Sequence, residues 1–90
     1  MSLSTLPESV RRCLQGLTRD QEIVLRDVNL RKTLKQIGKE RELGKAKAVR
    51  NILVSGLESM RTSGMEWTEL RAHFPTLANT VEAKEVFKQT

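Results

Sequence analysis

Basic side chains at helical spacing are the residues in this sequence whose arrangement most clearly suggests a chemical role. Nine Lys or Arg and three acids lie between Arg26 and Arg50, which gives this stretch a net charge of +6 against +5 for the whole chain. Positive charge concentrated in this way favours an anionic partner, above all the phosphates of a nucleic acid. We expect seven residues to contact phosphate: Arg31, Lys32, Lys35, Lys39, Lys45, Lys47 and Arg50.

The spacing of these residues indicates a ridge along one helix that continues onto the next, beyond Gly44. With about five phosphates engaged, log affinity should fall against log salt with a slope of about −4.5. Two other interpretations stay open, because basic residues also keep helices soluble and also meet acidic protein or lipid surfaces. The sequence does not separate DNA from structured RNA. Aromatic residues make up 3% of the chain, which favours contact with a duplex backbone over base stacking, and Trp67 is expected to pack in the core.

Catalysis has little support in the residue types. The chain has one Cys and one His, Cys13 and His73, and a metal site needs several converging ligands. Cys13 lies in the apolar stripe of the first expected helix, where a thiol packs as a small hydrophobic group. The glycines form no phosphate-binding motif. We therefore expect a non-enzymatic protein without a metal, a cofactor or a small-molecule substrate, whose binding to nucleic acid has a regulatory or architectural role.

A helix-turn-helix is the obvious way to read DNA, and it requires a small residue in its first helix and a glycine at the turn. Placing the turn at Gly44 puts Glu40 at the position for the small residue. The same alignment puts Lys45 and Arg50 at positions that should be apolar. This register does not favour the motif.

A second possible helix-turn-helix joins residues 67–74 to residues 79–87. Its apolar positions fit better, but Pro75 occupies the turn and the charges of the second helix cancel. A neutral helix is poorly suited to a groove lined with phosphates.

An apolar strip supports a competing function, that of a protein-protein adaptor or a small chaperone-like subunit. The sequence from Ile23 to Leu30 is apolar around most of a helix circumference, and such a helix is normally covered on two sides. A partner helix or a symmetric copy would supply the second cover, so we expect a homodimer or a partner protein. The residues expected at this contact are Ile23, Val24, Leu25 and Val28.

These side chains need helices to position them, and apolar periodicity predicts five segments. They are residues 6–16, 19–43, 45–62, 64–74 and 80–88. Within 19–43, Ile23, Leu30, Leu34 and Ile37 share a seam about 40–60° wide, at about 100° per residue. Segment 45–62 carries a broader stripe that includes Val49, Leu53 and Leu57. The fold expected is a single all-α domain over residues 1–90, with four to five helices and one long central helix.

Capping signals mark the starts of these segments. Four candidate capping boxes begin at Thr5, Thr18, Ser63 and Asn79. Gly44 and Gly64 are placed to end helices. Gly38 and Gly56 fall inside predicted helices, where each indicates either a close backbone crossing or a bend.

The cellular compartment follows from what the sequence lacks. A single cysteine forms no internal disulfide, no apolar run approaches the roughly 18 residues of a membrane span, and the start does not resemble a signal peptide. We expect a cytoplasmic or nuclear protein.

Overall fold

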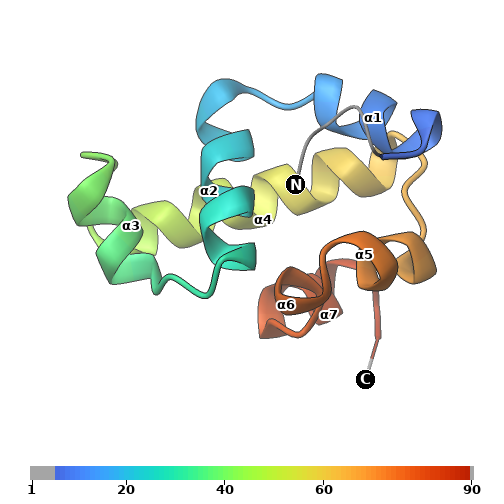
Figure 1. Cartoon of the computed structure of the whole chain (residues 1–90). Helices are drawn as coiled ribbons and strands as arrows, with labels where there is room; N and C mark the ends of the chain where they lie inside the picture. Colours follow the sequence, from blue (N-terminus) through green and yellow to red (C-terminus); the bar gives the residue numbers. More distant parts are fainter. Residues whose placement is uncertain (1–5, 90) are drawn as a thin grey trace.

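The computed structural model describes residues 6–89, and all regular structure in that range is helical (Figure 1). The small all-helical domain expected from the sequence is confirmed, although the helices number seven rather than four to five. They are α1 (Glu8–Gln15), α2 (Arg19–Asn29), α3 (Leu34–Glu40), α4 (Ala46–Thr62), α5 (Trp67–His73), α6 (Pro75–Ala78) and α7 (Val81–Val86). None of these seven has the length and apolar character needed to cross a bilayer.

α4 is the centre of the fold. It is 17 residues long and packs against α1, α2, α3 and α7. Its apolar stripe is buried as predicted, with Val49 and Leu57 completely covered. α1 and α3 lie at opposite ends of α4, while α5, α6 and α7 gather beneath one half of it (Figure 1). The long central helix is therefore α4 and not the 19–43 segment.

The 19–43 segment is two helices, α2 and α3, and the prediction of one helix was wrong. α2 ends because Arg31 adopts the left-handed conformation, with φ 70°. The Arg31 amide then donates to the Val28 carbonyl oxygen, and the Lys32 amide donates to that of Asp27, which closes a Schellman turn. Thr33 starts α3 by accepting from the Gln36 amide. The predicted seam is broken at this turn, so that Leu30 is 69% exposed while Ile37 is fully buried.

Three further helices end in the same kind of turn. Gly64 is the left-handed residue after α4, as expected, whereas Glu42 and Lys88 take that position after α3 and α7. In each case the next residue donates its amide five residues back, as Leu43 does to the Gly38 carbonyl oxygen. α3 therefore ends before Gly44, and Gly44, with φ 102°, lies in the turn that leads into α4.

One of the four predicted capping boxes is confirmed, two are displaced and one cannot be assessed. The box from Thr18 to Gln21 is confirmed, with both side chains bonded to backbone amides. The other starts are displaced, because Glu66 rather than Ser63 caps α5 and Thr80 rather than Asn79 caps α7. Thr5 lies outside the described residues.

The apolar strip proposed for a partner is covered by the chain itself. Val24 is fully buried, and Leu25 and Val28 are 4% and 6% exposed. α2 packs on both α4 and α6, which supply the two covers that the strip requires. Ile23 remains half-buried. The strip therefore belongs to the hydrophobic core of the chain, because α6 covers the side of α2 for which the sequence indicated no neighbour.

Gly38 lies at a close crossing between α3 and the segment that enters α4. Of the two explanations offered for this glycine, a close backbone crossing and a bend, the structure supports the crossing. A Cβ atom at residue 38 would collide with the carbonyl oxygen of Gly44 and lie 3.1 Å from Val49 Cγ2. Gly56 is similarly tight, since a Cβ there would lie 3.0 Å from Leu25 Cδ1. The packing of α3 on α4 thus depends on residue 38 having no side chain.

We predict that Gly38→Ala lowers the free energy of unfolding by about 1–3 kcal/mol, because backbone rather than a flexible side chain blocks the new methyl group. Urea denaturation followed by circular dichroism measures the change. Gly16→Ala is the control, since the nearest atoms to a Cβ at residue 16 lie at ordinary distances of 3.6 and 3.7 Å. Equal stability of the two variants would contradict the close crossing.

Glu42, the left-handed residue after α3, is a position where we expect a substitution to stabilise the protein. Glu42→Gly should raise the free energy of unfolding by about 0.5 kcal/mol, because relief of the left-handed conformation outweighs the extra flexibility of glycine in the unfolded chain. Glu58→Gly, within the exposed face of α4, should lower it by about 1 kcal/mol. Chemical denaturation of both variants checks the sign, and a loss of stability in both would show that residue 42 is not left-handed.

Candidate nucleic-acid interface

α3 and α4 are consecutive helices that pack on each other and are joined by residues 41–45, the order of elements found in a helix-turn-helix. The register tested on the sequence was wrong because it placed the small residue at Glu40. The residue that meets the Gly44 backbone is Gly38, and the apolar contact from α4 is Val49 rather than Lys45 or Arg50. The other candidate pair fails for a different reason, since α6 (Pro75–Ala78) lies between α5 and α7.

Four of the predicted basic residues are exposed on this pair. Lys35 and Lys39 are one turn apart on α3, so they share one side of that helix. Lys45 stands at the start of α4 and Lys47 in its first turn. No carboxylate within residues 6–89 forms an ion pair with any of the four. The structure thus places these four lysines on two neighbouring elements with their charges unneutralised.

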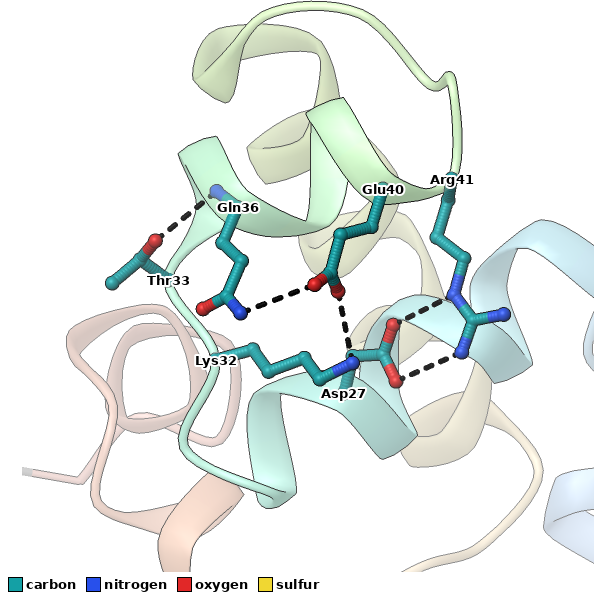
Figure 2. Close-up of polar contacts among 6 residues, drawn as sticks. All are labelled: Asp27, Lys32, Thr33, Gln36, Glu40 and Arg41. Atoms are coloured by element: carbon teal, nitrogen blue, oxygen red, sulfur yellow. Dashed lines mark hydrogen bonds and ion pairs between the residues drawn. The ribbon is translucent and has the colours of Figure 1, made fainter.

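Arg41, at the end of α3, is engaged by a carboxylate of the chain itself. Its Nε and Nη2 donate to the two carboxylate oxygens of Asp27, at 3.0 and 3.3 Å (Figure 2). Asp27 is 2% exposed, and no other charged residue among residues 6–89 is buried. Its carboxylate raises the pKa of the Arg41 guanidinium, first through the hydrogen bonds and then through its charge. This bidentate pair ties the C-terminal part of α2 to the end of α3.

Lys32, which precedes α3, is paired in a similar way with a carboxylate at the end of that helix. Its Nζ lies 2.9 Å from Glu40 Oε1, and Gln36 Nε2 donates to the other oxygen of the same carboxylate at 3.2 Å (Figure 2). The bond from Lys32, then that from Gln36, lowers the pKa of Glu40. Glu40 therefore stays charged and keeps Lys32 from acting as a free cation.

Arg50 and Arg31 complete the predicted set, but neither belongs to the group of unpaired lysines on α3 and α4. Arg50 Nε donates to Glu82 Oε2 at 3.2 Å, which links α4 to α7. Arg31 lines a hollow with residues of α5, α6 and α7. The seven basic residues are therefore divided into four free lysines, two paired residues and one that belongs to another surface.

The start of α4 is electrostatically unusual. α2, α3 and α7 each begin with a threonine side chain bonded to a backbone amide, but Lys45 at the start of α4 makes no such bond. The first turn of α4 contains no acid and includes Lys47. Because a helix start carries partial positive charge, two lysines there are unfavourable unless an anion approaches.

The outward face of α4 contains two exposed residues that the predicted contact set does not include. Ala48 and Asn51 lie beside Lys47, and together they present small and amide side chains next to the lysines. Asn51 follows Lys47 by four residues, and this spacing is the sequence signal that places both on one side of the helix.

The lone cysteine and histidine do not form a site. Cys13 is 3% exposed, and burial raises the pKa of its thiol, as does the charge of Glu69. The thiol packs in the core as expected and lies 3.6 Å from the Ser63 carbonyl oxygen. His73 is half-buried beside Phe74 and Leu77. Among residues 6–89, no group of His, Cys, Asp or Glu is close enough to hold a metal ion.

The Asp27–Arg41 pair can be tested by removing each partner in turn. Asp27→Asn should lower the free energy of unfolding by about 1 kcal/mol, since the half-exposed guanidinium regains water. Arg41→Gln should cost more, because it leaves a buried carboxylate without its partner. Arg26→Gln, which removes an exposed pair with Glu22, should change stability by less than about 0.5 kcal/mol. Urea denaturation ranks the three variants, and an Arg41→Gln effect no larger than that of Arg26→Gln would contradict the pair.

Comparison with known proteins supplies no relative for this chain. No protein-family model matches it, and neither a curated protein nor a solved structure matches it. Any assignment of function therefore depends on the charges and contacts described above.

Proposed function

We propose that this protein is a non-enzymatic DNA-binding module that places the first turns of α4 in the major groove. The observation that carries the proposal is the group of four unpaired lysines on the α3–α4 pair: Lys35, Lys39, Lys45 and Lys47. A helix-turn-helix normally inserts its second helix into the groove while the preceding helix crosses the backbone. In this protein, those roles fall to α4 and α3.

Phosphate contact is favoured by the start of α4. The amides of its first turn have no side-chain cap, and Lys45 and Lys47 add full charges to the partial charge of the helix. A DNA phosphate near this end would accept from the free amides and neutralise the lysines. Lys35 and Lys39 on α3 would hold neighbouring phosphates. Each contact releases a condensed counterion, which supplies much of the binding free energy.

Base contacts would come from the exposed face of α4. Asn51 carries an amide of the type that pairs with the major-groove edge of adenine, and Ala48 is small enough to meet a thymine methyl group. Lys47 lies beside them and could bond guanine. These side chains project from a rigid helix, which favours a defined orientation in the groove.

Duplex DNA suits this surface better than duplex RNA. The major groove of B-form DNA admits a helix, whereas that of A-form RNA is deep and narrow. Single-strand binding would need exposed aromatic residues for stacking, and neither α3 nor α4 contains one. The adaptor function is not favoured, because Val24, Leu25 and Val28 are buried in the chain's own core. The four lysines belong to one copy, so the proposed contact does not require a dimer.

Salt dependence provides the decisive test. With four phosphates engaged, the slope of log affinity against log salt for duplex DNA should be about −3.6. Lys35→Gln with Lys39→Gln should reduce the slope to about −1.8, because two counterions fewer are released. Fluorescence anisotropy of a labelled duplex at several salt concentrations measures both values.

The matched control removes the same charge elsewhere. Arg11→Gln with Arg19→Gln alters exposed residues of α1 and α2, and α1 lies at the far end of α4 from α3 (Figure 1). This double variant should keep the slope of the original protein. If both double variants lost the same amount of slope, net charge alone would account for the effect, and the α3–α4 site would be excluded. Preferential binding of duplex RNA would rule out insertion of α4 into a major groove.

A further inference from the structure

A second cationic surface lies away from α3 and α4. It is a hollow of about 860 Å³ formed by the turn after α2 together with α5, α6 and α7. Its lining includes Arg31, Trp67, Arg71, Asn79, Lys84 and Gln89. The volume falls in the range of sites that bind small organic ligands.

The charge of this hollow has one sign. Arg31, Arg71 and Lys84 come from three different segments, and no acidic residue is part of the lining. None of these three cations forms an ion pair with a carboxylate among residues 6–89. Cations that share one concavity repel each other, so an anion of high charge density, such as a phosphate, would be held strongly.

The Schellman turn that ends α2 fixes the position of Arg31 at the hollow. Its backbone has φ 70°, the left-handed conformation that Glu42 and Lys88 also adopt at the ends of α3 and α7. The amides of Arg31 and Lys32 donate to the carbonyl oxygens of Val28 and Asp27, so the backbone that carries this guanidinium is held to α2.

Trp67 gives the hollow an aromatic wall. It is half-buried, and its ring lies 6.0 Å from that of Phe87 at a tilt of 46°. Trp67 and Arg71 are four residues apart, so they lie on one side of α5. An indole beside a guanidinium is a combination that stacks a flat ring and binds its phosphate at the same time.

We propose that this hollow binds a nucleoside phosphate, with the base against Trp67 and the phosphates among Arg31, Arg71 and Lys84. The side-chain amide of Asn79 would bond the edge of the base, and Gln89 would offer its amide oxygen, since its Nε2 already donates to the Phe87 carbonyl oxygen. The ligand is either a free nucleotide or one nucleotide of a single strand, since both offer a base next to a phosphate. This site is independent of the proposed DNA contact, which uses α3 and α4.

The chain contains one tryptophan, so its fluorescence reports on this hollow directly. Titration with ADP should quench the emission saturably, and calorimetry should give the same Kd. Adenosine and inorganic phosphate should each bind at least tenfold more weakly than ADP, because each lacks one half of the recognition. A short single-stranded oligonucleotide forms the second arm, and the tighter of the two ligands identifies the natural source.

Two variants connect the binding to the cations. Arg71→Gln and Lys84→Gln should each weaken ADP binding about tenfold through the loss of a charge-assisted hydrogen bond. Circular dichroism should show that both remain folded, since neither residue is part of the core. Lys47→Gln should leave ADP binding unchanged while it weakens binding to duplex DNA, which separates the two sites.

Three results would overturn this proposal. They are the absence of saturable binding to both ADP and the oligonucleotide, equal binding by inorganic phosphate and ADP, and unchanged binding in both Arg71→Gln and Lys84→Gln. Because none of them depends on duplex DNA, failure here would leave the proposed function of α3 and α4 standing.

Discussion

The close approach of Gly38 to the Gly44 backbone is the constraint on which the arrangement of this protein depends. It brings α3 against the start of α4 without an intervening side chain. Ile37 then reaches the core, and the opposite side of α3 turns outward with Lys35 and Lys39. The Asp27–Arg41 pair holds the end of α3 to α2 from the other direction. The free lysines are therefore oriented by one glycine contact and one partly buried ion pair.

Internal ion pairs decide which of the basic residues can meet a ligand. Lys32, Arg41 and Arg50 are matched by Glu40, Asp27 and Glu82 respectively. A charge count along the sequence cannot detect such matching, because Arg50 and Glu82 are 32 residues apart. The stretch from Arg26 to Arg50 keeps its net charge, but pairing confines the free charge to α3, the start of α4 and Arg31.

The sequence predicts a helix well where the apolar stripe is broad and uninterrupted, and it predicts a helix start well where a threonine box is present. Segment 45–62 illustrates the first, since Val49 and Leu57 are buried, and the Thr18 box illustrates the second, since both of its bonds form. The break at Arg31 could not be predicted, because an arginine in the left-handed conformation carries no signal of its own. That one error merged α2 with α3 and joined Leu30 to Ile37 in a single seam, although Leu30 is exposed and Ile37 is buried. The position of α6 on α2 was a tertiary effect beyond any local pattern.

The two cationic surfaces differ in a way that bears on how selective each can be. The α3–α4 surface is built from lysines, which are flexible point charges that tolerate many phosphate positions. The hollow uses Arg31 and Arg71 beside Trp67, and a planar guanidinium next to an indole demands a ligand of defined shape. Lysines thus suit contact along a polymer of uniform charge, whereas the arginines suit recognition of a single group. One small helical domain can present both because each surface uses different helices.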